Sequence, residues 1–387
     1  MGQVMALRRF LSLGVLAAML GLSARALAHD EQSERPAASR PFDKDQGTNP
    51  LRGSTLLLEQ SMTTQTAGLG TTPQSYVPLY ELWLSLRPRY FFDEHWSVRG
   101  RFDYTKELTN NQPTTLARED VFGDIWTDLV YGTTLDSLWK GTKADVGLRA
   151  LWPTSKISRG NGTYVTLGGR AGASHDFEIK GDDAPALNSA HVALRFVYLH
   201  PFSTATTPTG YGGFAYVRED TDAHSFVSDQ LQGSTLVNHE VWASLEGGLQ
   251  ITPKLSLTAY MIFINQWHYI PQDHGIALTS TGPVTVPRSA NDEQFTQNTW
   301  LLATLDYELF EELDLSLGYY DLANYIAPDG QRRGVFGSDN VWWSPDARVF
   351  FTVTANLDAL YDDALRHRYS KRAAQSARLP GVLGGLR

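Results

Sequence analysis

The sequence predicts an all-β protein: a single closed, antiparallel, up-and-down β-barrel of about 12 strands, within a range of roughly 10 to 14, that spans a membrane. Three observations lead to this fold class. Apolar and polar residues alternate in many segments, the connections between these segments are alternately short and long, and the chain begins with an export signal. Glycine (33 residues) and aromatic residues (11%) also suit a protein of strands and turns.

Residues 1–28 have the parts of a secretory signal peptide. Arg8 and Arg9 supply the positive start, residues 10–22 the apolar stretch, and residues 26–28 (Ala-Leu-Ala) the cleavage site. The alternative is an N-terminal membrane anchor, which needs roughly 18 apolar residues, more than this stretch offers. We therefore expect cleavage and a mature chain that starts near His29.

The rest of the chain divides into three expected parts. Residues 29–52 are charged and have few large apolar side chains, which predicts a flexible N-terminal segment. No linker or shift in composition interrupts residues 53–357, so we expect one barrel domain there. Residues 358–387 form a basic tail, expected on the periplasmic side, in which residues 358–378 are either a short helix or disordered.

Alternation defines the strands. Leu82, Leu84 and Leu86, for example, alternate with polar neighbours, as the two faces of a strand require. A soluble sandwich turns its polar face to water, whereas a membrane barrel turns its apolar face to lipid, and the export signal favours the barrel. In chain order, the expected strands are Ser54 to Met62, Leu79 to Phe91, Trp96 to Leu108, Asp120 to Tyr131, Ala144 to Pro153, Tyr164 to Phe177, His191 to His200, Glu240 to Ile251, Leu255 to Trp267, Asn298 to Leu309, Leu313 to Ala323 and Arg348 to Leu357. An even number of strands puts both termini on the periplasmic side.

The connections between these strands alternate in length, as they do in barrels with short turns at one end and long loops at the other. The short connections are residues 93–95, 252–254 and 310–312, with 140–143 and 180–188 of intermediate length. The long connections are residues 63–78, 109–119, 154–162, 203–239, 267–297 and 324–347. A soluble sandwich has no reason to sort its loops in this way.

Aromatic residues and the last strand point in the same direction. Aromatic side chains cluster at strand ends, at residues 90–92 and Trp96 beside a short turn and at Trp152 and Trp267 beside long loops, as in membrane-interface girdles. The segment 348–357 places Val349, Phe351, Val353, Ala355 and Leu357 on one face.

With this final strand the chain resembles bacterial outer-membrane β-barrel proteins, the porin-like class in general, in which such a strand serves as the assembly signal. It departs from the class in one respect, because many members end on an aromatic residue and this chain continues as a basic tail. The resemblance implies the outer membrane of a Gram-negative bacterium as the location, and outer-membrane lipid and the barrel-assembly machinery as partners. We expect a monomer.

Composition excludes some function classes. The formal net charge of −9 becomes about −12 once the signal peptide is removed, which argues against nucleic acid as a partner. The chain has no cysteine, so it cannot form disulfides or a cysteine metal site. No dinucleotide or phosphate-loop fingerprint occurs, and we expect no cofactor and no metal.

Charged residues alternate with the apolar ones and would line the interior of a barrel. Arginines dominate the earlier strands and carboxylates the later ones, although several acids, such as Asp103 and Asp128, fall on the basic side. The functional hypothesis is a passive channel for small polar or anionic solutes, with charge selection by Arg87, Arg89, Arg99, Arg101, Arg149, Arg170 and Arg195, opposed by Glu240, Glu246 and Asp306. The alternative is a network of ion pairs that fills a narrow barrel. A surplus of unpaired arginine favours the channel.

Two other functions are weighed against the channel. A barrel enzyme at the outer rim would need a constellation such as Ser174, His175 and Asp176, or Asp273 and His274. Adjacent residues on a strand point to opposite faces, which argues against Ser174 with His175, and we expect no enzyme and no catalytic residue. A non-conducting binding or scaffold barrel, with long loops folded over its mouth, is the other alternative.

Two further patterns have a structural explanation. The acidic segment 219–222 could offer oxygen ligands to calcium, but it lacks the rest of an EF-hand spacing, so a solvated loop explains it better. The glycine pairs at 168–169 and 247–248 precede no helix. Such pairs in a barrel strand usually mark curvature or close packing, not a phosphate loop.

Overall fold

The computed structural model describes residues 49–64, 66–68, 79–109, 118–137, 139–179, 189–204, 206, 235–269, 274–279, 282–287, 295–324 and 347–362. The expected signal peptide, most of the N-terminal segment and the tail beyond residue 362 lie outside this part of the chain. Among the described residues, no helix is long and apolar enough to cross a membrane.

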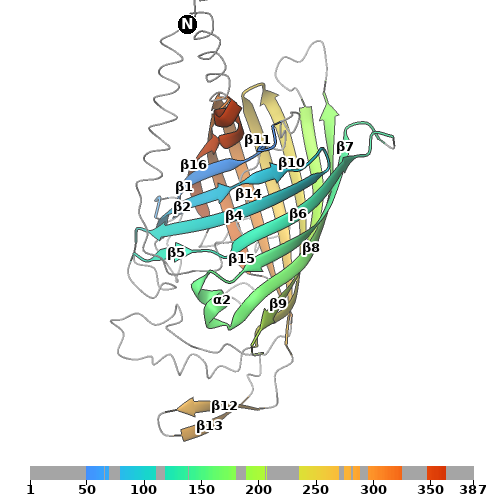
Figure 1. The fold of residues 1–387 in the computed structure, drawn as a ribbon. Helices are drawn as coiled ribbons and strands as arrows, with labels where there is room; N and C mark the ends of the chain where they lie inside the picture. Colours follow the sequence, from blue (N-terminus) through green and yellow to red (C-terminus); the bar gives the residue numbers. More distant parts are fainter. Residues whose placement is uncertain are drawn as a thin grey trace, which may run out of the picture.

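The described elements are almost all strands (Figure 1). They are β1 (Thr55–Thr63), β2 (Tyr80–Arg87), β3 (Arg89–Phe91), β4 (Trp96–Glu107), β5 (Asp120–Phe122), β6 (Ile125–Thr134), β7 (Thr142–Trp152), α2 (Lys156–Gly160), β8 (Thr163–Glu178), β9 (Ser189–Ser203), β10 (Val237–Thr252), β11 (Leu255–His268), β12 (His274–Thr279), β13 (Gly282–Pro287), β14 (Phe295–Phe310), β15 (Leu313–Asn324) and β16 (Arg348–Asn356).

The sheet closes on itself. Neighbours in the sequence are neighbours in the sheet, β1 pairs with the last strand β16, and β2 pairs with both β1 and β4. With β2 and β3 counted as one strand, and β5 and β6 as another, the described residues form a closed antiparallel barrel of 12 strands. The hairpin β12–β13 lies outside this sheet, in the connection between β11 and β14. The predicted fold class is confirmed.

Each of the 12 segments expected from the sequence coincides with a strand, and two of them are interrupted. Pro88 separates β2 from β3, because proline has no N–H to give to the ladder. Gly123 and Asp124 separate β5 from β6, and both halves still pair with β4.

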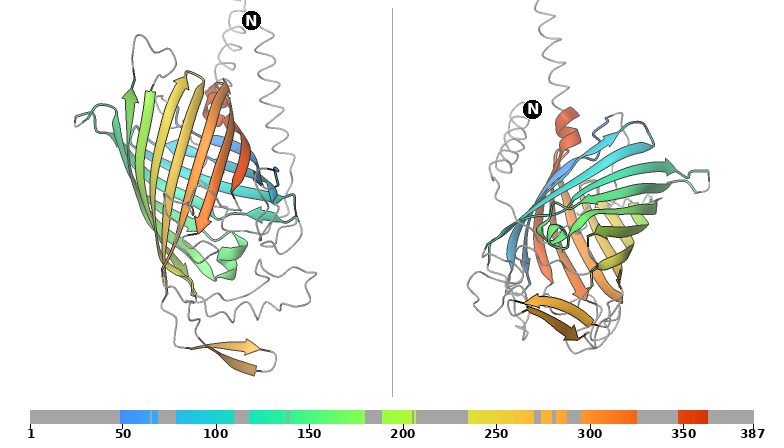
Figure 2. Two further views of the ribbon diagram at one scale, coloured as in Figure 1. Left: turned by 180° about the vertical axis from the view of Figure 1, so that it is seen from behind. Right: turned by 60° about the horizontal axis from the view of Figure 1, so that its bottom comes forward.

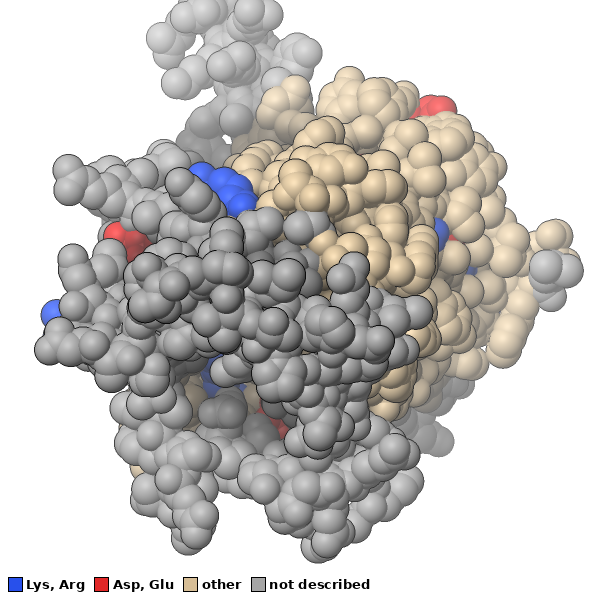
Figure 3. Space-filling view, turned by 90° about the horizontal axis from the view of Figure 1, so that it is seen from below, with Lys and Arg blue, Asp and Glu red and all other residues tan. Residues whose placement is uncertain are grey.

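The outer face of the barrel is apolar. Leu148 is 68% exposed and Leu245 is 52% exposed, although both lie in the middle of strands, whereas their neighbours Arg149 and Glu246 are buried. Figure 2 shows the strands as a wall around an enclosed interior, and the described outer wall in Figure 3 is mostly uncharged. Apolar side chains that face outward and charged ones that face inward are the arrangement of a membrane barrel, and the reverse of a soluble sandwich.

The two ends of the barrel differ as predicted. The helix α2, in the connection between β7 and β8, and the β12–β13 hairpin lie at the bottom in Figure 1, and the end of β16 lies at the top. Exposed aromatic residues occur at both ends: Tyr90, Phe92 and Trp96 lie near the short β3–β4 turn, and Trp152, Tyr164, Trp267 and Phe295 lie near the long loops. These are the girdles that position a barrel at the two membrane interfaces.

A single carboxylate organises the β3–β4 turn. Asp93 Oδ1 accepts hydrogen bonds from the backbone N–H groups of His95 and Trp96, each at 2.7 Å. Because both bonds favour the ionised carboxylate, that of Trp96 more strongly, they hold the pKa of Asp93 below its ordinary value of 3.8. Two backbone hydrogen bonds to the Asp93 carboxylate therefore stabilise this short turn.

The chain after β16 starts as a helix on the outside of the barrel. Residues 357–362 are helical, and Leu357 and Leu360 contact outward-facing residues of the first and last strands, including Leu56. Asp358 accepts a hydrogen bond from the backbone N–H of Gly53 at 2.8 Å, which ties the end of the barrel to its beginning. The first residues of the expected tail are therefore helical.

Candidate functional site: the charged interior

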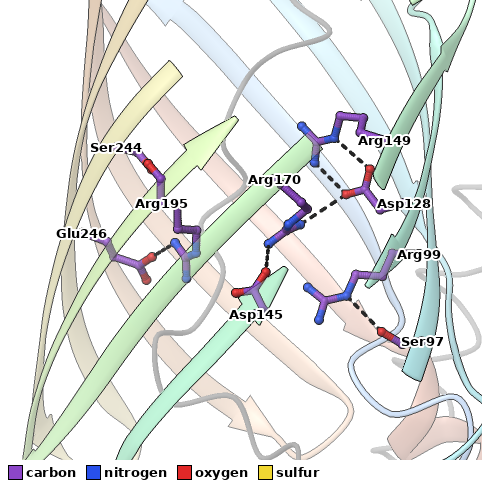
Figure 4. Close-up of polar contacts among 9 residues, drawn as sticks. All are labelled: Ser97, Arg99, Asp128, Asp145, Arg149, Arg170, Arg195, Ser244 and Glu246. Atoms are coloured by element: carbon purple, nitrogen blue, oxygen red, sulfur yellow. Dashed lines mark hydrogen bonds and ion pairs between the residues drawn. The ribbon is translucent and has the colours of Figure 1, made fainter. Parts of the chain in front are cut away.

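Two arginines and two carboxylates form a network on the inner face of β6, β7 and β8 (Figure 4). Arg149 donates two hydrogen bonds to Asp128, both of 2.7 Å, and these two residues lie directly opposite each other on β7 and β6. Arg170 on β8 donates to Asp128 at 3.2 Å and to Asp145 at 2.9 Å. Arg99 projects into the same space from β4, and its Nε donates to Ser97 at 3.4 Å.

A second polar chain crosses the inner face from β8 to β11. Arg195 on β9 forms an ion pair with Glu246 on β10, and the Tyr260 hydroxyl donates to the same carboxylate at 3.0 Å. His191 lies between two acids: its Nδ1 is 2.5 Å from Asp176, and its Nε2 is 3.8 Å from Glu246. These groups come together because β8, β9, β10 and β11 are consecutive in the sheet.

The remaining predicted arginines lie near the first strands, as does Arg348, which was not among the predicted charge-selecting residues. Arg101 forms an ion pair with Asp103 at 2.6 Å, and Arg348 on β16 forms one with Glu81 at 2.5 Å across the barrel's closing seam. The Nε of Arg87 donates to Ser85 at 3.0 Å. The backbone N–H of Arg89 donates to Ser54 at 2.9 Å.

Glu240 and Asp306, on later strands, accept hydrogen bonds from neutral donors. Glu240 accepts hydrogen bonds from the indole of Trp242 and from Gln266, the latter at 2.6 Å. Asp306 accepts from Thr304 at 2.9 Å and from Thr258 at 3.5 Å. Glu240 lies on β10 and Asp306 on β14, later in the sheet than the arginines of β4 to β9.

The structure corrects one part of that argument. The sequence suggested a surplus of unpaired arginine, but Arg101, Arg149, Arg170, Arg195 and Arg348 each bind a carboxylate. Most partners, such as Asp128 and Asp145, come from the adjacent strand. Buried guanidinium groups require such partners, and the register supplies them.

Sequence reasoning missed a group of large apolar side chains in the interior. Trp126 lies between Asp124 and Asp128 in the strand direction, and Trp242 between Glu240 and Ser244, so each shares the inward face with polar residues. They belong to one buried cluster, which comprises Trp126, Leu151, Leu199, Trp242, Ile262, Ile264 and Trp300. Their place in the alternation with Asp128 and Glu240 was the available signal.

The predicted enzyme constellations do not assemble among the described residues. His175 lies on the outer face, stacked on Trp139 with ring centroids 4.0 Å apart, and it hydrogen-bonds Thr142 at 2.8 Å. Asp176 lies on the inner face and binds His191. Ser174 and His175 therefore point to opposite sides of the wall, as the strand geometry predicted.

The remaining candidate sites from the sequence are the pair of Asp273 and His274, the acidic segment 219–222 and the two glycine pairs. Asp273 and the acidic segment 219–222 lie outside the described residues, and His274 is described only as the first residue of β12. Both glycine pairs lie inside strands, and a Cβ at Gly168 would come within 1.9 Å of the Tyr198 carbonyl oxygen, so close packing requires that glycine. Within the described part of the chain, no cluster of three or more potential metal ligands occurs.

Comparison with known proteins gives structural likeness only. No family model and no curated protein sequence matches the chain. The NanC porin is similar at a TM-score of 0.40 and 10% identity, over 78% of this chain and 98% of that one. An outer-membrane channel from Pseudomonas putida F1 is similar at a TM-score of 0.43 and 10% identity, over 80% and 98%. The calcium-bound outer-membrane phospholipase dimer from Salmonella typhi is similar at a TM-score of 0.32 and 12% identity, over 82% and 97%.

Proposed function

We propose that this protein is an outer-membrane channel for the passive passage of small polar or anionic solutes. The observation that carries the proposal is that charged groups inside the barrel keep access to water. The side chain of Arg195 is 34% exposed and that of Asp145 is 23% exposed, although both point inward (Figure 4). A solvated, charged interior inside an apolar wall is what a polar solute needs in order to cross a bilayer.

The location and assembly belong to the same proposal. We propose export through the signal peptide at residues 1–28, insertion into the outer membrane of a Gram-negative bacterium with the help of barrel-assembly machinery, and function as a monomer. The apolar outer wall and the two aromatic girdles support the membrane location. The long loops are then extracellular, and the short turns are periplasmic.

We propose a modest preference for anions. Arg99, Arg170 and Arg195 project into one side of the interior, where they would attract anions. The carboxylates that bind Arg170 and Arg195 reduce the net field, so these arginines should bias the current without excluding cations.

We propose no catalytic role for the chain. Ser174 and His175 lie on opposite faces of the barrel wall. This supports the absence of a catalytic role, because a nucleophile and its base must lie within hydrogen-bond reach of each other. The pair formed by Asp176 and His191 lies on the inner face, and its role in the proposal is to join the polar lining.

A specific contact favours a second candidate, a barrel that binds a ligand without conducting. Trp126 and Trp242 lie on strands separated by three others, yet their ring centroids are 5.8 Å apart. Side chains that touch across the interior narrow any passage at that height. A barrel that holds a ligand there would need no continuous water path.

Conductance across a planar bilayer tests the proposal. The refolded protein should give single-channel current in potassium chloride, with a reversal potential in a salt gradient that indicates a preference for chloride. Replacing Arg99 and Arg101 together with alanine should lower that preference. An unchanged reversal potential would remove these arginines from the pathway, and the absence of any current would reject the channel in favour of the binding barrel.

A matched control removes a positive charge from the outer face. Lys106 lies on β4, like Arg99 and Arg101, but its ammonium binds Asp120 at 2.8 Å on the outside of the wall. Lys106→Ala should leave the reversal potential at its wild-type value. A shift of the reversal potential as large as that of the Arg99 and Arg101 double variant would mean that ion selectivity depends on the total charge of the protein. It would not then depend on the charges that line the interior.

A further inference from the structure

Guanidinium groups and indole rings alternate along the inner wall from β2 to β7. The guanidinium carbon of Arg87 lies 5.4 Å from the ring centroid of Trp83, and that of Arg101 lies 5.5 Å from the same ring. The guanidinium of Arg101 is also 4.8 Å from the ring of Trp126, and that of Arg149 is 4.4 Å from it. Trp126 therefore lies between two cations, one from β4 and one from β7.

This row of alternating guanidinium groups and indole rings ends at a contact across the interior. Trp126 on β6 meets Trp242 on β10, with ring centroids 5.8 Å apart and an angle of 51° between the ring planes. Strands β7, β8 and β9 separate them in the sheet, so the contact bridges the interior and does not follow the wall. Both indoles are buried, at 6% and 7% exposure. A solute that moves through the barrel at this height must pass these two rings.

We propose that Trp126 and Trp242 form the solute-selecting constriction, and that it favours flat aromatic carboxylates over aliphatic carboxylates of the same size and charge. The inference rests on the proposed channel function and names the substrate class of that channel. The predicted charge-selecting arginines supply the attraction for the anion, and the indoles supply the discrimination between aromatic and aliphatic groups.

The expected preference for aromatic over aliphatic carboxylates follows from how aromatic rings contact one another. Passage must separate Trp126 from Trp242, and an aromatic solute replaces the lost ring contact with a new offset-stacked or edge-to-face contact on each side. An aliphatic ring gives burial of apolar area but lacks the matching quadrupole. The preference should therefore be about two- to tenfold, the range that one aromatic contact gives.

The arginines add charge recognition at the same place. A guanidinium that stacks on an indole through its face keeps its N–H groups in the plane of its edge, where a carboxylate binds. The guanidinium carbons of Arg101 and Arg149 lie 4.8 and 4.4 Å from the Trp126 ring centroid, and the same two guanidinium groups bind Asp103 and Asp128. A flat anion at this height can thus meet the Trp126 indole with its ring, while the arginines of the interior attract its charge.

Benzoate and cyclohexanecarboxylate are matched probes, because they share a six-membered ring and one charge and differ in aromaticity. Reversal potentials with each anion against chloride should give a permeability about two- to tenfold higher for benzoate. Equal permeabilities in the wild-type protein would overturn the inference, even where potassium chloride current confirms the channel.

Variants at Trp126 test whether the preference for benzoate comes from the aromatic ring itself and not from a change in the fold. Trp126→Leu should abolish the preference for benzoate, and Trp126→Phe, which keeps an aromatic face, should retain most of it. Trp242→Leu should raise the potassium chloride conductance, because it removes one side of the contact. Trp152→Leu makes the same exchange on the outer wall, where Trp152 is 48% exposed, and should change nothing. Equal selectivity in Trp126→Leu and wild-type protein would overturn the inference.

Binding in detergent distinguishes failure of the channel from failure of the constriction. If the protein passes no current, isothermal titration of the refolded protein with each anion still tests the aromatic site. Benzoate should bind about two- to tenfold more tightly than cyclohexanecarboxylate, and Trp126→Leu should remove the difference. Equal binding of the two anions would reject the site, whatever the conductance.

Discussion

Replacing Asp128 with asparagine should destabilise the barrel more than any other single removal of an interior charge that we consider. Asp128 accepts two hydrogen bonds from Arg149 and one from Arg170. The Arg149 and Asp128 side chains are only 9% and 7% exposed. Removing one partner of such a buried pair costs about 3 to 5 kcal/mol, because the other charge stays buried without compensation.

In the Asp128→Asn variant, Arg149 is the arginine that loses its carboxylate partner. Arg170 keeps its 2.9 Å contact with Asp145 in the Asp128→Asn variant, whereas Arg149 loses both charge-assisted hydrogen bonds. The expected cost is therefore near the lower end of that range, at about 3 kcal/mol. Asp145→Asn is the matched control. Asp145 is 23% exposed and its partner Arg170 keeps Asp128, so its loss should cost about 1 kcal/mol or less.

Urea-driven unfolding and refolding in phospholipid vesicles, followed by tryptophan fluorescence, measures both variants. We expect a clear drop in the free energy of unfolding for Asp128→Asn and a small one for Asp145→Asn. Equal losses in the two variants, or a loss below about 1 kcal/mol for Asp128→Asn, would show that water screens the interior network as it screens a surface pair.

Two further predictions concern the outer wall and a turn. Leu245→Arg should destabilise the protein in vesicles by about 2 to 4 kcal/mol, because it places a charge in lipid, whereas Ser244→Arg on the inner face should cost much less; similar losses would contradict the assigned facing. Asp93→Ala should lower the urea midpoint at neutral pH, because the lowered pKa of Asp93 means that its ionised form stabilises the turn. That contribution is present above the ordinary pKa of 3.8 and is lost as the pH falls through the lower folded value, so the variant and the wild type should converge in acid. A difference that persists in acid would refute it.

The strands and their facing could be predicted from the sequence because both follow from local alternation. Leu148 and Arg149 occupy adjacent positions in one strand, so one of them must face lipid if the expected export signal favours a membrane barrel. Even the break at Pro88 follows from its missing N–H group.

The contacts inside the barrel depend on register and cross-section, which local sequence does not encode. The pair formed by Asp176 and His191 exists because β8 and β9 align these two residues directly. The contact between Trp126 and Trp242 depends on how far apart two walls of the closed barrel lie. Alternation could have placed both indoles on the inner face, but it could not have shown that they meet.

The facing of two adjacent residues decides whether the outer wall meets lipid and the interior holds water. The chain has no native cysteine, so a single introduced cysteine can be labelled without interference. Single cysteines at Ser244 and Leu245, labelled with bimane in vesicles that contain brominated phospholipid, report contact with acyl chains. We predict strong quenching at position 245 and little at 244, with the cysteine at 244 open to a water-soluble thiol reagent. Quenching at 244 and protection at 245 would contradict an apolar wall that faces lipid and a charged interior that holds water.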